Sequence, residues 1–289
     1  MNLETLDPAM VEAAFMRHGA CSVSLSDAGD DPVLEPGTGE TPLWSHTRIT
    51  ALFPGDADLA ALRAALLVEL GLDTLPAHTI ERLVDRDWER EWLRDFKPMR
   101  FGQRLWVCPG DFDVGEPDPV VVRLDPGLAF GTGTHLTTAL CLEWLDGLSL
   151  AGKVMLDYGC GSGILAIAAL KLGCRTATAM DIDPQALTAT ADNAAANGVA
   201  ARLKVVASAD EIKGKFDLTI ANILAGPLVQ FAESITSTIR SHGMLALSGV
   251  LCEQAADVMD AYEPWVEFEE PRFRAQDGQS WSLLTGTRR

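Results

Sequence analysis

The sequence predicts an α/β protein in which a mostly parallel sheet is covered by helices on both faces and follows a smaller α+β domain. Strand and helix patterns alternate regularly from Thr137 onward, which is typical of a parallel sheet with crossover helices. The first 84 residues differ, because their apolar spacing indicates helix, strand, strand and helix. A chain of 289 residues can hold two domains of about 150 residues each.

The N-terminal domain, residues 1–84, is expected to be a small α+β sandwich. Its apolar residues recur at helical spacing in two segments and alternate in two others, and a third strand is possible before residue 85. The expected elements are helices at Asp7–His18 and Ala57–Leu70 and strands at Ala20–Leu25, Arg48–Phe53 and Thr79–Val84. The segment SDAGDDPVLEPGTGE, residues 26–40, is rich in glycine, proline and acidic residues and is expected to be an exposed loop.

A linker helix is predicted over residues 85–98. Trp88, Trp92 and Phe96 lie at positions i, i+4 and i+8, so their rings share one helical face, and Pro98 ends the helix. The aromatic stripe is explained either by core packing or by a helix that docks the two domains.

The second domain, residues 99–289, carries the alternating pattern of a doubly wound sheet. We expect strands at Val154–Tyr158, Thr176–Asp181, Leu203–Ala207, Phe216–Ala221, Met244–Ser248, Trp265–Glu269 and Trp281–Thr285. We expect helices at Thr137–Leu145, Ile164–Leu172, Pro184–Asn197, Pro227–Ile239 and Cys252–Ala261.

Composition restricts the classes of function. A net charge of −18 argues against direct binding to nucleic acid, which needs local excess of Lys and Arg. The same charge suits a basic partner, although it is also explained by solubility alone. Six scattered cysteines without a CxxC pair predict reduced thiols and no metal site. The acidic N-terminus resembles no secretion signal and no apolar stretch is long enough for a membrane span, so we expect a cytoplasmic protein.

The strongest local signal is VMLDYGCGSGILAIAALKLG, an apolar strand that ends near Asp157 and passes through three glycines into a helix. Glycines allow the backbone to approach a ligand, and the helix N-terminus suits a carboxylate or phosphate. Gly159, Gly161 and Gly163 follow the spacing G-x-G-x-G rather than the G-x-G-x-x-G of dinucleotide-binding folds. This difference favours a nucleoside that carries methionine over a dinucleotide.

Asp181 and Asn222 follow two strands of the predicted sheet, at the edge where ligands bind. Asp181 can accept two ribose hydroxyls, whereas Asp183, just before Pro184, is better explained as a helix cap. The Asn222 carbonyl oxygen can accept an N–H from a substrate amine and orient the nitrogen lone pair. The alternative for Asn222 is an N-cap of the next helix.

The segment DPGLAFGTGTHLTTALCLEWL is a Gly/Thr loop that leads into an amphipathic helix before the first strand of the sheet. Thr137 and Thr138 are expected in its first turn, where a hydroxyl reaches ligand or backbone. Phe130 can pack on an adenine or methionine portion. His135 is either a loop-stabilising hydrogen-bond partner or a proton acceptor.

Together, DPGLAFGTGTHLTT, DYGCGSGILAIAALKLG, DIDPQAL, DNAAANGV and ANILAGPL resemble the PrmA family, which methylates the eleventh protein of the large ribosomal subunit. The resemblance extends over nearly the whole chain, including DWEREW and KPMRFGQRLWVCPGD. Leu136 departs from it, because the family commonly has proline there, and this frees φ at that position.

The resemblance implies a Rossmann-like methyltransferase domain that uses S-adenosylmethionine, without a metal, and an N-terminal domain that docks the ribosomal protein. It implies that Thr138, Gly159, Asp181 and Asn222 contact the cofactor and that Phe130 and Gly131 line the same pocket. Gly161 joins this set through the glycine motif. The expected products are methylated N-terminal and lysine amines of the ribosomal protein, free or nascent.

Two other functions stay open on the sequence. The same scaffold serves methyltransferases of other proteins, RNA or small molecules, since fold does not determine substrate. The second open function is that of a non-catalytic assembly factor that binds the cofactor and a ribosomal protein.

Overall fold

The computed structural model describes residues 1–3, 5–29, 43–83, 97–110, 114–124, 135–276 and 278–289. The chain divides into two compact units, Met1–Arg86 and Asp87–Arg289, which we describe separately. Most of the expected linker helix, with its aromatic stripe, lies outside the described residues. Within the described ranges, no helix has the length and apolar character needed to cross a membrane.

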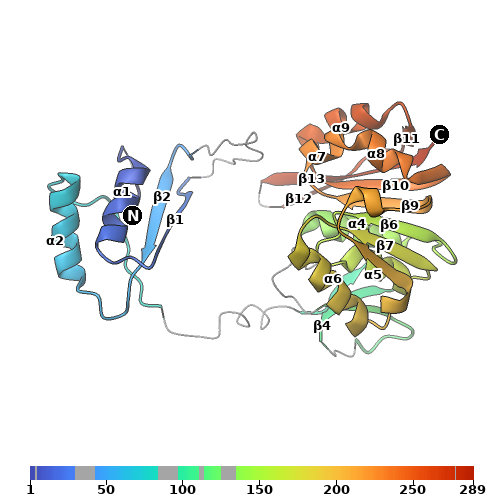
Figure 1. Cartoon of the computed structure of the whole chain (residues 1–289), viewed down its shortest axis with the longest axis horizontal. Helices are drawn as coiled ribbons and strands as arrows, with labels where there is room; N and C mark the ends of the chain where they lie inside the picture. Colours follow the sequence, from blue (N-terminus) through green and yellow to red (C-terminus); the bar gives the residue numbers. More distant parts are fainter. Residues whose placement is uncertain (4, 30–42, 84–96, 111–113, 125–134, 277) are drawn as a thin grey trace. The chain divides into compact units, whose positions relative to one another are not determined.

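The N-terminal unit is a two-stranded antiparallel sheet on which α1 packs, with α2 packed in turn on α1 (Figure 1). Aspartates cap both helices: Asp7 accepts the Ala9 N–H, and Asp58 accepts those of Ala60 and Ala61. Val11, Phe15 and Leu66 form part of a small apolar core. The elements are α1 (Pro8–Arg17), β1 (Ser22–Asp27), β2 (Thr47–Leu52) and α2 (Leu59–Leu70).

The expected strand at Thr79–Val84 is wrong as far as the structure describes it, because residues 79–83 form no strand. Ile80 and Leu83 are both exposed. Apolar residues at strand spacing do not make a strand unless a neighbouring strand pairs with them, and the described sheet of this unit consists of β1 and β2.

The second unit contains an eight-stranded sheet in the order β11-β13-β10-β9-β6-β7-β8, with β12 paired to β13. The central strands β8, β7, β6, β9 and β10 are parallel, and β13 runs antiparallel to its neighbours. The strands are β6 (Val154–Tyr158), β7 (Thr176–Met180), β8 (Leu203–Val206), β9 (Phe216–Asn222), β10 (Ile239–Leu251), β11 (Val266–Phe268), β12 (Arg272–Gln276) and β13 (Gln279–Arg288).

Helices cover both faces of this sheet (Figure 1). Successive strand residues point to opposite faces, so Met155 joins the core under α4 and α5, whereas Leu156 joins the core under α7 and α9. The α-helices are α4 (Leu136–Asp146), α5 (Ile164–Lys171), α6 (Pro184–Ala196), α7 (Ala225–Gln230), α8 (Ala232–Ser237) and α9 (Ala255–Tyr262). Short 3-10 helices are η2 (Ala200–Arg202), η3 (Ala209–Glu211) and η4 (Cys252–Gln254).

The expected helix Pro227–Ile239 is instead two short helices, α7 and α8, and its last residue begins β10. The interruption is at Phe231, whose φ of −103° and ψ of 16° leave the helical region.

A second, three-stranded sheet was not predicted. It consists of β3 (Met99–Phe101), β4 (Leu105–Pro109) and β5 (Val120–Leu124). The buried Asp146 at the end of α4 holds the β3–β4 turn by accepting the Gln103 N–H at 2.5 Å. On the other side of the same sheet, Asn197 exchanges hydrogen bonds with the backbone N–H and C=O of Arg123 in β5.

Candidate functional site

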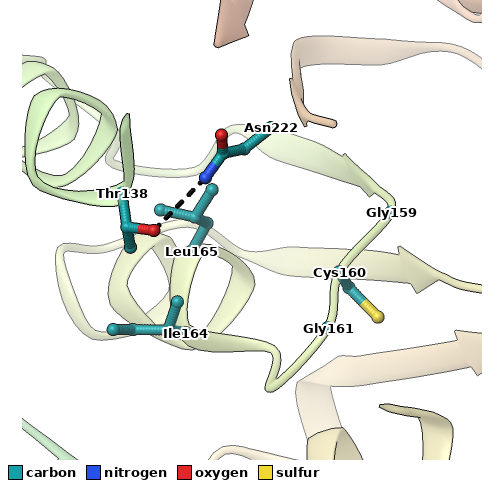
Figure 2. Close-up of a pocket in the computed structure, with 7 residues that line it drawn as sticks. All are labelled: Thr138, Gly159, Cys160, Gly161, Ile164, Leu165 and Asn222. Atoms are coloured by element: carbon teal, nitrogen blue, oxygen red, sulfur yellow. Dashed lines mark hydrogen bonds between the residues drawn. The ribbon is translucent and has the colours of Figure 1, made fainter. Parts of the chain in front are cut away.

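A pocket opens at the carboxyl ends of the adjacent parallel strands β6 and β9. The chain leaves these two strands in opposite directions across the sheet, because β6 is followed by β7 on one side and β9 by β10 on the other. Open α/β sheets bind ligands at such a switch point. The pocket is lined by Thr138, Gly159, Cys160, Gly161, Ile164, Leu165 and Asn222 (Figure 2).

The turn after β6 forms one wall of this pocket. Gly159 and Gly161 have φ values of 79° and 53°, in a region of backbone conformation that residues with a side chain rarely adopt. The N–H groups of Gly159 and Cys160 both donate to the Met180 carbonyl at the end of β7, at 2.8 and 2.9 Å. The turn is therefore anchored to the neighbouring strand while its other side faces the pocket.

Helix α5 begins directly after this turn. Its N-cap, Gly163, has φ of 78° and provides no side-chain cap, and the next residues, Ile164 and Leu165, line the pocket. An uncapped helix N-terminus presents backbone N–H groups and a partial positive charge, which suit a carboxylate.

Asp157, near the end of β6, lies fully buried beneath this helix start. Its Oδ2 accepts the Ala166 N–H at 3.0 Å, while its Oδ1 has no hydrogen-bond partner among the described residues. Loss of hydration raises the pKa of Asp157 to about 7, and the nearby Asp181 carboxylate adds to the rise.

Asn222, the last residue of β9, faces Thr138 of α4 across the pocket (Figure 2). Its Nδ2 donates to Thr138 Oγ1 at 3.3 Å, so the carbonyl oxygen points away from that partner. The alternative of an N-cap is not supported, because Leu224 is the N-cap of α7 and no side chain caps it.

Ile223 follows Asn222 and is held closely on two sides. A Cβ on Gly159 would lie 2.3 Å from Ile223 Cγ2, and one on Gly249 would lie 2.3 Å from the Ile223 carbonyl oxygen. The Ile223 N–H also donates to Ser248 in β10 at 3.1 Å. These contacts fix the backbone on which the Asn222 side chain is mounted.

Asp181 lies just after β7 and supports the glycine turn. Its Oδ2 accepts the Gly161 N–H at 2.8 Å, and its Oδ1 accepts the Asp183 N–H at 3.1 Å. It is not among the seven lining residues of the pocket. Asp183 caps α6 by accepting the Gln185 N–H, as expected.

His135 is the N-cap of α4. Its Nδ1 accepts the Thr137 N–H and lies 2.7 Å from Thr137 Oγ1, and its ring packs edge-on against Trp281. Burial lowers the pKa of His135, which favours the neutral ring that such an acceptor needs. This arrangement matches the loop-stabilising alternative. Leu136 is the first residue of the helix.

Four predicted residues, Thr138, Gly159, Gly161 and Asn222, are brought together in the pocket, whereas Phe130 and Gly131 lie outside the described residues. Sequence reasoning did not single out Cys160, Ile164 and Leu165 as lining residues. Their position inside the glycine motif could have revealed them. No set of three or more His, Cys, Asp and Glu side chains in the described part of the chain could hold a metal ion.

The fold and the site define a Rossmann-like, S-adenosylmethionine-dependent methyltransferase, in which an antiparallel strand is inserted between the fifth and sixth strands of the 3-2-1-4-5-6 order. The family model "Ribosomal protein L11 methyltransferase (PrmA)" matches residues 2–289. The chain belongs to this family.

Relatives and a solved structure agree with this assignment. The ribosomal protein L11 methyltransferases of Pseudomonas paraeruginosa and Azotobacter vinelandii are 52% and 53% identical, over 96% of this chain and 93% and 94% of their own. The crystal structure of a ribosomal protein L11 methylase from Lactobacillus delbrueckii subsp. bulgaricus superposes with a TM-score of 0.61 and 32% identity. It covers 67% of this chain and 100% of its own.

Proposed function

We propose that this enzyme transfers methyl groups from S-adenosylmethionine to amino groups of ribosomal protein L11, namely its N-terminal amine and lysine side chains. The observation that carries the proposal is the pocket that Asn222, Thr138 and the glycine turn line together, with the Asn222 amide directed at Thr138. Membership of the L11 methyltransferase family supports the protein substrate.

The residues of the site fit the cofactor by their chemistry. The start of α5, whose N-cap Gly163 has no side chain, suits its carboxylate, and Asp181 beside the glycine turn suits vicinal ribose hydroxyls. Gly159 and Gly161 leave room for close approach of a ligand to the backbone. We assign cofactor binding to Thr138, Gly159, Gly161, Asp181 and Asn222, together with Phe130 and Gly131 from outside the described residues.

When bound, S-adenosylmethionine supplies an electrophilic methyl group on a sulfonium. The protein must present a neutral amine in line with that group, although a lysine amine has a reference pKa of about 10.4. An apolar environment, to which the lining residues Ile164 and Leu165 contribute, would disfavour the ammonium and remove the need for a strong base. The Asn222 carbonyl oxygen would accept the remaining amine N–H and align the lone pair.

The N-terminal unit is the proposed docking site for the ribosomal protein, with residues 1–84 as the recognition domain and residues 85–98 as the linker to residues 99–289. The acidic chain suits a basic partner. The substrate would be met in the cytoplasm, where ribosomal proteins are made, either free or nascent.

The test is transfer of labelled methyl from S-adenosylmethionine to purified, unmethylated L11, followed by mass spectrometry of the product. We expect several turnovers and mass increments of methyl groups on amines. RNA and small amines serve as competing acceptors, and preferential labelling of either would replace L11 as the substrate. Tight cofactor binding without transfer to any acceptor would instead indicate a non-catalytic assembly factor.

A further inference from the structure

The backbone of the glycine turn is held by side chains from α6 and from the residue that follows β7. The Gly161 N–H donates to Asp181, as described above. The Gly161 carbonyl accepts the Thr190 hydroxyl at 2.9 Å, and the Ser162 carbonyl accepts Asn193 Nδ2 at 2.9 Å. Three consecutive peptide groups, from Cys160 to Gly163, therefore each have a side-chain partner.

Thr190 makes the closest contacts with the turn. Its hydroxyl also lies 3.4 Å from Cys160 Sγ, and a Cβ on Gly163 would come within 2.8 Å of its side chain. Thr190 is fully buried and Asn193 is 4% exposed. A core helix normally places apolar residues on its buried face, because a buried polar group without a partner is costly. On α6 the buried polar groups instead satisfy carbonyls of the turn.

We infer that Thr190 and Asn193 are positioning residues that set the shape of the cofactor turn and thereby the affinity for S-adenosylmethionine. This inference rests on the proposed cofactor role of the pocket. Gly161 lines the pocket, and its two flanking peptide groups are fixed by Asp181 and Thr190. Without the Thr190 hydroxyl, the Gly161 carbonyl loses that partner, and the turn shifts toward conformations in which water satisfies it.

Asn197, the residue that ends α6 as its C-cap, provides a matched control on the same face. Its spacing from Thr190 and Asn193 is helical, and it is buried like them. Its side chain bonds the backbone of Arg123 in β5 and the Asn193 carbonyl one turn before it, and not the glycine turn. Removing it should destabilise the fold without altering the turn. The exposed Thr188 lies on the same helix, and its hydroxyl donates to the Pro184 carbonyl within that helix. Thr188→Val therefore controls for the replacement of a threonine as such.

The experiment measures cofactor binding by calorimetry, together with kcat, KM and Tm, for full-length Thr190→Val, Thr190→Ser, Asn193→Leu, Asn197→Ala and Thr188→Val. We expect Thr190→Val and Asn193→Leu to raise the Kd for S-adenosylmethionine roughly tenfold, the scale of one lost buried hydrogen bond. The KM for the cofactor should rise in parallel, with kcat at saturation little changed. Thr190→Ser keeps the hydroxyl and should keep the wild-type Kd.

Comparison with the controls decides the inference. Asn197→Ala should lower Tm as much as Thr190→Val does while leaving the cofactor Kd unchanged. Thr188→Val should also leave the cofactor Kd unchanged. An unchanged Kd in Thr190→Val, or an equal rise in Asn197→Ala, would show that these residues only stabilise the fold. Failure of the wild-type chain to bind S-adenosylmethionine would overturn the proposed function itself and with it the role of Thr190.

Discussion

At the scale of single residues, Thr138 holds the Asn222 amide in one orientation. The hydrogen bond from Nδ2 to Thr138 Oγ1 leaves the carbonyl oxygen directed elsewhere. An amide group that can rotate freely would present donor and acceptor in turn to an incoming amine. Thr138 is thus expected to act partly through Asn222.

Replacing Asn222 with Ala should lower kcat about a hundredfold, because misalignment of reacting groups has effects of that size. Thr138→Val should lower kcat by about tenfold, since it releases the amide without removing it. In the double variant, Thr138→Val should add little to the loss from Asn222→Ala, which is the signature of coupled residues. The measurement is steady-state methyl transfer to L11. Independent, multiplying effects would contradict the coupling.

Asp157 predicts a pH dependence of stability. Its pKa rises from 3.8 in the unfolded chain to about 7 in the folded protein. The folded state therefore binds more protons between pH 4 and 7, and the free energy of unfolding falls as pH rises through this window. A shift of this size corresponds to ~4 kcal/mol at most. Asp157→Asn should remove this slope, so the variant gains stability relative to wild type as pH rises.

Denaturant unfolding of both proteins at several pH values between 4 and 8 checks this prediction. The difference between the two unfolding free energies isolates Asp157, because all other titrating groups are shared. A constant difference across the range would mean that Asp157 titrates at its ordinary pKa in the folded protein.

Much of the candidate site could be predicted from the sequence, because its residues follow strands at fixed positions. Glycines at positive φ and a polar residue at a strand end are local signals, and Thr138, Gly159, Gly161 and Asn222 do line one pocket. The hydrogen bonds of Asp181 were beyond sequence reasoning. They depend on how closely β7 approaches the glycine turn, and that is set by packing between strands.

At the scale of elements, β10 positions the site through one irregularity. Its register with β13 shifts between Ser248 and Val250, around Gly249, which has φ of 83°. The absence of a side chain there lets the Ile223 backbone lie against the strand. This β-bulge at Gly249 therefore helps to fix the position of the end of β9, which carries Asn222.

Gly249→Ala should be strongly destabilising and should lower kcat, because the added Cβ would meet the Ile223 backbone at 2.3 Å. Gly198→Ala is the matched control, since Gly198 also has positive φ, 69°, but its Cβ would meet nothing within 4 Å. The control should cost only about 1–2 kcal/mol. Thermal unfolding and methyl-transfer assays compare the two. Equal losses of stability and activity would mean that backbone strain alone, and not the Ile223 contact, matters at Gly249.

The elements that sequence analysis missed are short or depend on distant partners. Strand β3 has three residues, below the length at which alternation can be recognised. Strand β5 (Val120–Leu124) begins with three valines, and these β-branched residues were a usable signal. Conversely, residues 79–83 have strand-like spacing without a partner strand. The spacing of apolar residues indicates which secondary structure a segment can form. Whether a strand forms depends on a neighbouring strand that the rest of the fold supplies.

At the scale of the whole molecule, negative charge is distributed unevenly along the sequence. Residues 1–86 contain fourteen Asp and Glu and five Arg, with no Lys, whereas the remaining 203 residues contain eighteen of the 23 basic residues. The N-terminal unit therefore carries half of the net charge of −18 on less than a third of the chain. Such a concentration of one sign raises encounter rates with a partner of opposite sign.

If the N-terminal unit docks L11, the association should weaken as salt is added. Screening shortens the reach of exposed charges to about 3 Å at 1 M salt, so we expect the Kd for L11 to rise roughly tenfold or more between low and high ionic strength. Binding of S-adenosylmethionine provides the internal control, because the pocket proposed for it is lined by backbone and uncharged side chains. Calorimetric titrations of both ligands over the same salt series separate the two effects. An L11 affinity that changes no more than the cofactor affinity would show that the acidic N-terminal unit serves solubility rather than recognition.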